Sequence, residues 1–373
     1  MTARVFLHIG LPKTGTTYLQ DCLWDNKQEL AARGVLLPGR HRRRHLLASL
    51  DLRDDPNLAQ RPGDVEAPWQ ELVDEARAWD GDTVISHEFF ASASPEQVQR
   101  AVDAFPGAEV HVIVTARAMV GLGVSRWQEW VKNGGKKGID RYPPRSDYDP
   151  TDEWGWGSFD LADVLGRWGS VIPHERVHVL PMASSGGADP RDLWLRFLSV
   201  LGLDGDGLVA PEQKANRSLG LVEVELLRRV NARLTGFGSA FDRGTWIRGY
   251  LGEGDVLPDS REKFRPDDAI LEELSRRGER AVAMLRDEAF DVVGDVALLE
   301  PADLSGLRHP SDVSDAELVD AAAQTIANML ADVRSLTRER NQLVDEVRGR
   351  QGGPGLRVSV RRPWTRLLRG WRR

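Results

Sequence analysis

The sequence HIGLPKTGTTYLQ (residues 8–20) lies between an apolar run, VFLHI, and a stretch in which apolar residues have helical spacing. Gly10 and Gly15 permit tight turns, two threonines add hydroxyl donors at the predicted helix start, and Lys13 adds a positive charge. A glycine-containing loop between a strand and a helix offers backbone N–H groups and the positive end of the helix dipole to an anion. The stretch therefore predicts a phosphate-binding loop; the alternative is a capped helix start with a solvated lysine.

Strand-like and helix-like segments alternate after this loop. The predicted strands are residues 5–9, 83–86, 110–115 and 177–180. The predicted helices are residues 16–33, a helix capped by Ser94 and Gln97, and residues 120–132, 189–201, 218–234 and 267–285. Strands that alternate with helices at this spacing form a parallel sheet with helices on both faces. The sequence predicts an α/β fold of the P-loop-like kind.

Composition limits the classes of function. The chain has 373 residues, 41% of them hydrophobic, and a formal net charge of -7, which argues against a protein that coats nucleic acid. Its single cysteine, Cys22, cannot form an internal disulfide and is expected to be buried and inert. No apolar run is long enough to span a bilayer, and no signal sequence precedes the first strand. We expect a cytoplasmic protein without a nucleic-acid partner.

A second pair of residues points to an anion. The buried strand VHVIVT leads directly into Arg117, and Ser125 follows eight positions later, near the start of the next predicted helix. An arginine at a strand end and a serine on the next helix can hold one anionic group from two sides. Ligands of parallel sheets bind at the carboxyl ends of the strands, where the first loop also lies. Two anion sites at one edge indicate a ligand with two separated phosphates.

These features resemble the PAPS-dependent sulfotransferases, which transfer a sulfuryl group from 3′-phosphoadenosine 5′-phosphosulfate. Family members share a loop P-K-S/T-G-T-T followed by an aromatic residue, together with an arginine and a serine eight positions apart after a central strand. The matching loop residues are Pro12, Lys13, Thr14, Gly15, Thr16, Thr17 and Tyr18, and the matching pair is Arg117 and Ser125. The resemblance has anchors over roughly residues 4 to 200.

The resemblance implies a role for each matched position. Lys13 is expected at the oxygen that bridges phosphate and sulfate, and residues 15–17 around the 5′-phosphate. Tyr18 is expected near adenine, where many relatives carry tryptophan, and Arg117 and Ser125 are expected at the 3′-phosphate. The family's third nucleotide loop, R-K-G followed by G-x-W in the cytosolic branch, has no recognisable counterpart.

The position of the lysine fits sulfuryl transfer. In nucleoside triphosphatases the lysine directly follows the second glycine and works beside Mg²⁺, whereas Lys13 precedes Gly15. Sulfuryl transfer, like phosphoryl transfer, depends on positioning and on stabilising charge on the departing group. Lys13 could neutralise that charge itself, so we expect PAPS as co-substrate, adenosine 3′,5′-bisphosphate as product, and no metal.

A general base is predicted at the end of the second clear strand. The stretch TVISHEFFAS (83–92) places His87 and Glu88 at the same sheet edge as the phosphate loop. Sulfotransferases that act on cytosolic small molecules often use a histidine near such a strand, and those that act on polysaccharides often use a glutamate. Adjacent residues that leave a strand point in opposite directions, so one of the two is expected to face the site. The segment E-F-F resembles the carbohydrate-acting branch and favours Glu88, with His87 as the alternative or as a structural residue.

The acceptor is less well marked in the sequence. The resemblance favours a glycan or a glycolipid, and a small metabolite is the alternative. A basic run at residues 40–45 could receive an acidic acceptor, extend the field that attracts the donor, or be a solvated loop. The glycine- and proline-rich segment 133–149 could form a lid or sugar platform with nearby tryptophans, which could also fill the core: Trp127, Trp130, Trp154 and Trp156.

The C-terminal part differs in character from the sulfotransferase-like domain, which we predict to occupy residues 1–301. Residues 302–350 are predicted to form a helical extension, either a coiled coil of about three heptads that could make a homodimer or an amphipathic helix packed on its own domain. Residues 351–373 form a basic tail rich in arginine and tryptophan, which could contact an anionic membrane surface or another polyanion.

Two other functions are consistent with parts of this pattern. An ATP-dependent small-molecule kinase would require Mg²⁺ and would leave Arg117 and Ser125 without a role. A non-catalytic membrane adaptor that retains a nucleotide fold would tolerate the loss of Lys13.

Overall fold

The computed structural model describes residues 2–61, 63–143, 148–183, 191–212, 218–301 and 303–350, with the side chains of residues 348–350 excepted. The chain divides into two units, Met1–Ala321 and Ala322–Arg373. Among the described residues, no helix has both the length and the apolar character that crossing a membrane requires. The domain boundary expected at residue 301 stays a prediction.

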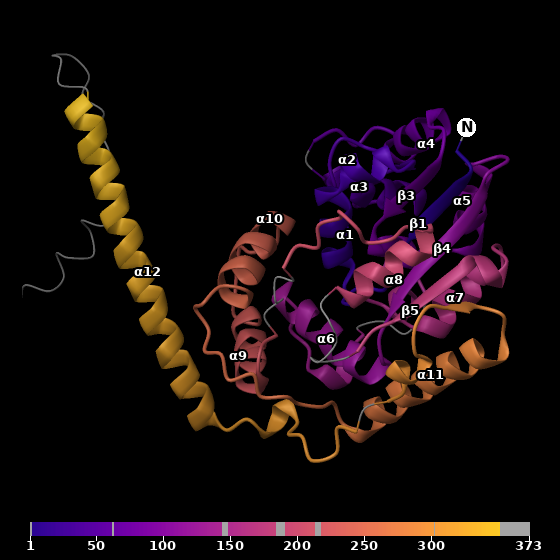
Figure 1. Ribbon diagram of the computed structural model, residues 1–373. Helices are drawn as coiled ribbons and strands as arrows, with labels where there is room; N and C mark the ends of the chain where they lie inside the picture. Colours follow the sequence, from indigo (N-terminus) through magenta and orange to yellow (C-terminus); the bar gives the residue numbers. More distant parts are fainter. Residues whose placement is uncertain are drawn as a thin grey trace, which may run out of the picture. The chain divides into compact units, whose positions relative to one another are not determined.

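The first unit is built on a six-stranded sheet in the order β2-β3-β1-β4-β5-β6, in which every described pair of neighbours is parallel (Figure 1). This arrangement confirms the predicted α/β class, with β1 between β3 and β4 at the centre. The carboxyl ends of these three strands lead into the predicted site segments. The strands are β1 (Arg4–His8), β2 (Val35–Leu36), β3 (Asp82–Ser86), β4 (Glu109–Ala116), β5 (Val177–Pro181) and β6 (Asp291–Val292).

Helices cover both faces of the sheet, as the alternating pattern predicts. On one face, side chains of α1 and α8 form a core cluster with Phe6, Val84 and Ile113 of the central strands. Figure 1 shows α1 on one side of β1 and β4, and α5 on the other. The helices of the first unit are α1 (Thr16–Asp25), α2 (Lys27–Ala32), α3 (Arg43–Leu52), α4 (Pro68–Ala78), α5 (Pro95–Asp103), α6 (Met119–Lys132), α7 (Leu161–Gly169), α8 (Asp192–Leu201), α9 (Leu221–Asn231), α10 (Ala240–Asp242) and α11 (Asp268–Asp287).

The helix predicted over residues 16–33 is two helices, which corrects the sequence reading. The chain breaks at Asn26, whose side-chain amide donates to the carbonyls of Cys22, at 2.7 Å, and Val209, at 2.7 Å. The same side chain accepts a hydrogen bond from the Val209 amide at 2.7 Å. The break therefore exists because Asn26 ties α1 to a segment 183 residues away, which helical spacing alone does not reveal.

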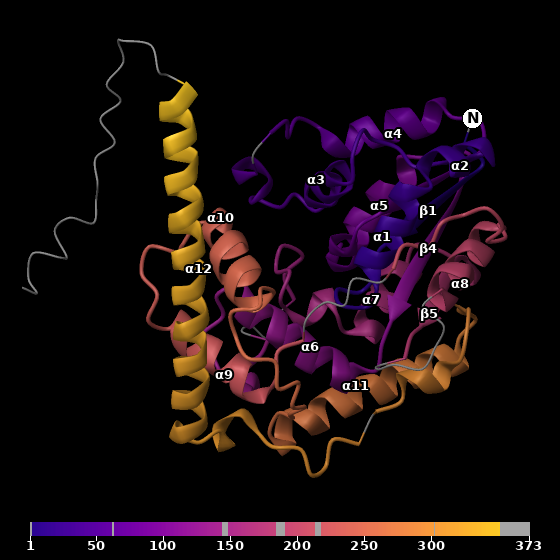
Figure 2. The ribbon, with the colours of Figure 1, turned by 60° about the vertical axis from the view of Figure 1, so that its left-hand side comes forward.

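Other sequence predictions are confirmed. Ser94 and Gln97 form the expected capping box at the start of α5. Cys22 is fully buried, and burial raises the pKa of its thiol to about 12. Trp127 is also fully buried and packs edge-on against Phe264, so it belongs to the core and not to a sugar platform. Helix α3, which begins within the basic run at Arg43, packs against α4 (Figure 2).

A short π-helix, Arg243–Gly252, follows α10 and contacts α6. π-helical turns are rare and occur often at functional sites. The long helix α12, Asp315–Arg350, begins in the first unit, and its residues 322–350 are the described part of the second unit. The predicted tail, residues 351–373, lies outside the described residues, as do the predicted helix start at residues 189–190 and residues 144–147 of the predicted lid.

Candidate active site

The phosphate loop connects β1 to α1 with an unusual backbone. Gly10, Lys13 and Gly15 have positive φ angles of 58°, 71° and 80°. A positive φ is uncommon for lysine, and such strained residues occur mainly where surrounding structure enforces them, often at functional sites. A Cβ atom at Gly10 would come within 2.3 Å of Thr16 Cγ2, so only glycine fits where the loop folds against its own helix.

Thr14 holds this loop in place. Its hydroxyl accepts a hydrogen bond from the Leu11 amide at 3.1 Å and lies 2.7 Å from the hydroxyl of Thr115 on β4. Thr14 is fully buried. Its side chain therefore shapes the loop, and a contact between that hydroxyl and a nucleotide would require these bonds to be exchanged.

The start of α1 is suited to an anion. Gly15 is the N-cap, and the described residues supply no side-chain cap and no acidic residue in the first turn. The first amides of a helix have no partner within the helix, and with the helix dipole they attract negative charge. Thr17 is exposed, whereas Tyr18 is 8% exposed and packs in the core cluster of α1 and α8. The predicted contact between Tyr18 and adenine stays a prediction.

Lys13 extends from this loop to helix α6. Its Nζ lies 3.1 Å from Glu129 Oε2, and the two side chains are only 19% and 10% exposed. Burial favours a raised pKa for the Glu129 carboxyl, but the charges of Lys13 and Arg248 outweigh it and hold that pKa below its usual value. The lysine of the phosphate loop is therefore held beside a carboxylate that is ionised at neutral pH.

One face of α6 carries Glu129, the residue that Lys13 contacts. Ser125, Glu129 and Lys132 are spaced four and three residues apart, which places them on the same side of the helix. Because Glu129 contacts Lys13, the same face brings Ser125 toward the phosphate loop. The helix thus links the phosphate loop to a segment about a hundred residues later in the sequence.

The π-helix adds a further cation to this cluster. Arg248 Nε lies 3.1 Å from Glu129 Oε1 and 2.9 Å from Glu253 Oε1. A Cβ atom at Gly252 would come within 2.9 Å of Lys132 Cγ, so the end of the π-helix lies against that lysine. Lys132 is buried, and burial, only partly offset by Glu129, lowers its pKa to about 8. Lys13, Arg248 and Lys132 therefore surround one carboxylate.

Arg117 follows β4 directly, next to the phosphate loop because β4 pairs with β1. Burial lowers the pKa of its guanidinium, which still carries its charge at neutral pH. Arg117 therefore lies at the sheet edge that carries the phosphate loop. Ser125 lies within α6, and the expected contact of Arg117 and Ser125 with a 3′-phosphate stays a prediction.

Glu88 begins the turn that follows β3, on the other side of β1. A Cβ atom at Gly10 would lie 3.4 Å from Glu88 Cβ, so this turn touches the phosphate loop. Gln20 of α1 donates from Nε2 to Glu88 Oε2 at 3.2 Å. Burial raises the pKa of the Glu88 carboxyl, but His87, backbone and Gln20 contacts outweigh it, and the net shift is downward. Glu88 is thus an ionised carboxylate, 23% exposed, at the loop's edge.

His87 is held in one tautomer. Its Nδ1 accepts a hydrogen bond from the Phe89 amide at 3.1 Å, so in the neutral ring the proton is on Nε2. That nitrogen lies 4.0 Å from Glu88 Oε2. Burial lowers the pKa of His87 to about 4, so the ring is neutral at pH 7. With one nitrogen protonated and the other bonded to the backbone, His87 is poorly placed to accept a proton from a substrate.

Two more buried histidines surround the end of β3. His45 accepts from the Ser86 amide at 3.0 Å through Nδ1 and contacts the Pro38 carbonyl at 2.8 Å through Nε2. His8 Nδ1 lies 2.7 Å from Ser86 Oγ. Burial lowers the pKa of each to about 4. The turn that carries Glu88 is therefore framed by neutral rings.

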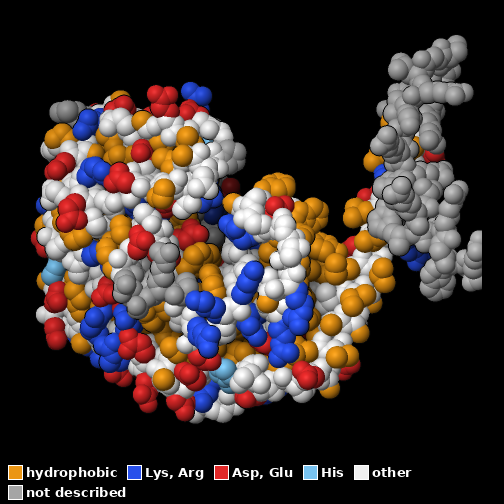
Figure 3. Space-filling view, turned by 180° about the vertical axis from the view of Figure 1, so that it is seen from behind, with side chains coloured by type: hydrophobic (Ala, Val, Ile, Leu, Met, Phe, Trp, Pro, Cys, Tyr) orange, Lys and Arg blue, Asp and Glu red, His pale blue; other side chains and the backbone are white. Residues whose placement is uncertain are grey.

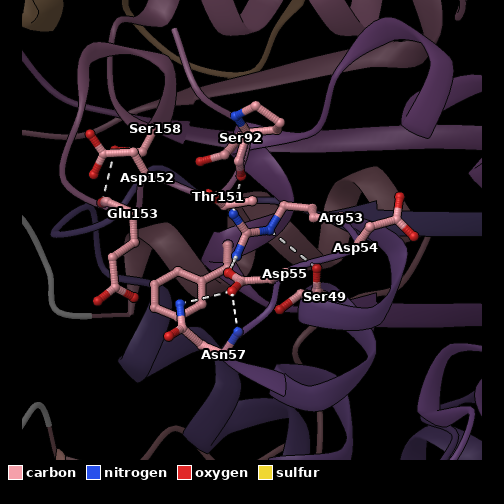
Figure 4. A network of polar contacts seen from close by, with 12 residues as sticks. Ser49, Arg53, Asp54, Asp55, Asn57, Ser92, Thr151, Asp152, Glu153 and Ser158 are labelled. Atoms are coloured by element: carbon pink, nitrogen blue, oxygen red, sulfur yellow. Dashed lines mark hydrogen bonds and ion pairs between the residues drawn. The ribbon is translucent and has the colours of Figure 1, made fainter. Parts of the chain in front are cut away.

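A buried arginine supports the same turn (Figure 4). Arg53, at the end of α3, pairs with Asp55 at 3.0 Å and donates from Nε to the Ser49 carbonyl at 3.2 Å. Its guanidinium lies 5.6 Å from the centre of the Phe89 ring. Asp55 in turn accepts from the amide and the side chain of Asn57, each at 2.9 Å. This network joins the end of α3 to the Glu88 turn.

The basic run is less solvated than one sequence reading expects. Arg44 is buried and paired with Glu71, and His45 is buried as described, so these two residues belong to the fold of α3. A cavity of about 360 Å³ lies beside them; its lining residues are Arg40, His41, Arg43, Arg44, Leu47, Gly63, Asp64 and Glu71. Arg42 pairs with Asp21 of α1 at 2.6 Å, and its charge also acts on His87 and Glu88.

Comparison with known proteins gives little beyond the residues themselves. No protein-family model matches the sequence, and no curated protein matches it. Among solved structures, a sulfotransferase from Alicyclobacillus acidocaldarius is 15% identical with a TM-score of 0.43, and the match covers 76% of this chain and 96% of that chain. In the described part of this chain, no group of three or more His, Cys, Asp or Glu side chains is placed to hold a metal ion.

Sequence reasoning missed Glu129, Lys132 and Arg248. Glu129 and Lys132 had a detectable signal, because they follow Ser125 at helical spacing and therefore share its helix face. Arg248 had none, because a π-helix lacks a sequence pattern that separates it from other turns. The site therefore contains a second set of charges around Lys13 that only the fold brings together.

Proposed function

We propose that this chain is a PAPS-dependent sulfotransferase that transfers a sulfuryl group to a hydroxyl or amine. The observation that carries the proposal is the position of the P-K-T-G-T-T loop. It lies between the Glu88 turn on one side and Arg117 with the Ser125 face of α6 on the other. The loop thus has the ionised Glu88 carboxylate on one side, which we call the acceptor side, and the cations Arg117, Lys132 and Arg248 on the other, which we call the donor side.

The donor side fits a nucleotide with two anionic ends. The uncapped start of α1 can receive the 5′-phosphate, and Arg117 with Ser125 can receive the 3′-phosphate. Lys13 and Arg248 supply charge between them. Figure 3 shows Lys and Arg side chains gathered beside a hollow near the middle of the face that it draws. Such a surface favours the approach of a highly charged nucleotide.

The transfer step follows from the residues on each side of the loop. Glu88 would take the proton of the acceptor hydroxyl as the acceptor oxygen bonds to sulfur. On the donor side, Lys13 would leave Glu129 and donate a hydrogen bond to the bridging oxygen, which keeps the electron pair of the breaking S–O bond. His87 would hold the Glu88 carboxylate through Nε2–H. The products are the sulfated acceptor, adenosine 3′,5′-bisphosphate and a proton on Glu88.

We infer that the acceptor is a glycan or a glycolipid. The Glu88-Phe89-Phe90 segment supports this because it resembles the glutamate-containing segment of the carbohydrate-acting branch. The tautomer of His87 supports it too, because it argues against the histidine base of the small-molecule branch. The contact of the basic tail with an anionic membrane surface stays a prediction.

Calorimetric titration tests the central proposal. Adenosine 3′,5′-bisphosphate should bind at least about tenfold more tightly than ADP in the absence of Mg²⁺, because Arg117 and Ser125 contact only the 3′-phosphate. Arg117→Ala should remove that preference and leave ADP binding nearly unchanged. Arg276→Ala, at an exposed arginine of α11, is the matched control and should behave as the wild type.

Equal binding of the two nucleotides by the wild type would overturn the proposal. Mg²⁺-dependent preference for ATP would favour the kinase instead, and full activity of Lys13→Ala in any function of the chain would favour a non-catalytic adaptor.

A further inference from the structure

Helix α12 presents an apolar seam within the second unit. From Ile326 to Val347 the apolar residues recur at alternating steps of three and four, and the seam has a single interruption at Arg340. This is the spacing of the a and d positions of a heptad. The apolar residues of the seam are 38% to 62% exposed, and they are Ile326, Met329, Val333, Leu336, Leu343 and Val347. A row of this length on one helix face, about 30 Å, is far more than scattered surface residues produce.

We propose that the seam is the interface of a homodimer, in which two copies of α12 form a parallel, in-register, two-stranded coiled coil. The occupant of each seam is the same seam of a second copy of this chain. This inference is independent of the proposed enzymatic function, because all of its residues belong to the second unit.

The identities of the core residues favour two strands. The a positions carry the β-branched residues Ile326, Val333 and Val347, and the d positions carry Leu336 and Leu343, with Met329 at the first d. β-branched residues at a with leucine at d favour parallel dimers, whereas isoleucine at both positions or the reverse arrangement favours higher oligomers. The chain uses the dimer pattern at every apolar position of the last two heptads.

The charges beside the seam favour the parallel orientation. The g positions are acidic at Asp332, Glu339 and Glu346, whereas the e positions that follow, Thr337 and Val344, are uncharged. In a parallel dimer each g residue lies across from an e residue of the partner, so the acidic side chains meet neutral ones. In an antiparallel dimer g lies across from g, and acidic side chains would repel each other. Like charges placed together act against the wrong arrangement.

Arg340 fits the same arrangement. It occupies an a position, and in a parallel dimer the side chain at a packs beside the partner's preceding g residue. That residue is Glu339, so each arginine can leave the seam and pair with a carboxylate of the other helix. A polar residue at a single a position costs stability but specifies the register and the number of strands.

The first test is the mass of the full-length chain in solution. Sedimentation equilibrium over about a hundredfold range of concentration should give a concentration-dependent approach to twice the chain mass of 41.6 kDa. Leu336→Lys should reduce the species to the monomer, because it places a second cation in the seam next to Arg340. Arg338→Lys, at an f position on the outer face, is the matched control and should remain dimeric.

A monomeric wild type at all concentrations would overturn the proposal, and so would a trimer, or a dimer that survives Leu336→Lys. Because Leu336 is exposed on the described chain, its substitution should not unfold the protein. An unchanged thermal unfolding midpoint of the first unit would verify that point.

The second test is orientation. In a Cys22→Ser background, Leu343→Cys places one thiol at a d position, where a parallel in-register dimer brings it against its own copy. Mild oxidation should then give a disulfide-linked dimer in high yield, and Arg338→Cys, at the outer face, should not. No cross-link at position 343 in a species shown to be dimeric would overturn the parallel register.

Discussion

The two sides of the phosphate loop differ in what their carboxylates contact. On the α6 side, three cations surround one carboxylate, with Lys13 and Arg248 on its two oxygens at 3.1 Å each and Lys132 close by. On the β3 side, one carboxylate, Glu88, lies among the histidines 8, 45 and 87, whose pKa values burial lowers to about 4. On the α6 side the carboxylate contacts cations directly. On the β3 side the described contacts of the Glu88 carboxylate are with neutral side chains, and the charges of Arg42 and Arg248 act on it from a greater distance.

Under the proposed function, the difference fits two tasks at one sheet edge, donor binding and proton acceptance. An anionic donor needs cations that are already present and already ordered, and Glu129 keeps them so while no anion competes. A general base needs an ionised carboxylate without a strong cationic partner, because such a partner would weaken it as a proton acceptor. The contacts described for the Glu88 carboxylate are a hydrogen bond from Gln20 and a longer approach by His87, both neutral side chains at pH 7.

The largest effect should come from the base. Glu88→Gln should reduce kcat by about 10²–10⁴-fold, because the amide cannot accept the proton of the acceptor. His87→Gln should cost much less, since His87 only orients the carboxylate. Steady-state rates of sulfuryl transfer to a glycan acceptor measure both. If His87→Gln reduced kcat more than Glu88→Gln did, His87 would be the base and Glu88 the orienting residue. The contrast between the two sides of the loop would then be wrong.

The pH profile gives the same test another form. Because the pKa of Glu88 is lowered in the folded protein, the carboxylate stays ionised through neutral pH. kcat/KM should therefore be flat between about pH 5 and 8 and fall only in acid, as the carboxyl becomes protonated. A rise of activity through pH 6 to 7 would indicate a histidine instead.

Lys13 should give the next effect. Lys13→Ala should reduce kcat by about 10²–10³-fold, the range for removing one donor that stabilises charge on a departing group. Lys13→Arg keeps the charge but changes its reach and geometry, and it should recover only part of the rate. Circular dichroism should show an unchanged fold in both variants. Wild-type rates for Lys13→Ala would break the assignment of the α6 side to the donor.

Substitution of Glu129 should have a smaller effect, and it should strengthen nucleotide binding. Glu129→Gln removes the carboxylate that competes for Lys13 and Arg248, so adenosine 3′,5′-bisphosphate should bind severalfold more tightly, a gain of about 1 kcal/mol. The gain should shrink as salt is raised, since the gained attraction is electrostatic. Calorimetry at two salt concentrations measures it.

The matched control is Glu225→Gln. Glu225 also lies between two arginines, with Arg228 at 2.6 Å and Arg229 at 2.8 Å, but on α9. It should leave nucleotide affinity unchanged. Weaker binding by Glu129→Gln would mean that Glu129 orders the cations more than it competes with the ligand.

The sequence predicts which segments share the sheet edge better than it predicts which charged side chains contact each other there. Strand ends are local features, so residue patterns alone assign the loop at Lys13, the turn at Glu88 and the strand exit at Arg117 to one edge of the sheet. The contact of Lys13 with Glu129 joins residues 116 positions apart, and no local pattern contains it. The same holds for the helix break at Asn26, which depends on a partner 183 residues away.

The sequence leaves the choice between Glu88 and His87 open for a related reason. The two residues are neighbours, and strand geometry says only that they point apart. The feature that distinguishes their roles is the hydrogen bond from the Phe89 amide to His87 Nδ1. This bond depends on the conformation of the turn, which the residue types alone do not reveal. The electrostatic role of each residue at this site depends on tertiary contacts. Motif spacing therefore identifies the candidate residues but does not assign a role to each.

Lys132 should give the smallest effect and the finest test of the charged side. Burial lowers its pKa to about 8, so the ammonium is charged at pH 7 and loses its proton as the pH rises through 8. If it contributes to the field that holds the donor, the affinity for adenosine 3′,5′-bisphosphate should fall about fivefold between about pH 7 and 9. Lys132→Arg keeps its charge throughout this range and should give a nearly flat profile. If the two proteins gave parallel profiles, the charge of Lys132 would not contribute to nucleotide affinity. Lys132 would then only balance the charge of Glu129, and Lys13 and Arg248 would bind the donor without its help.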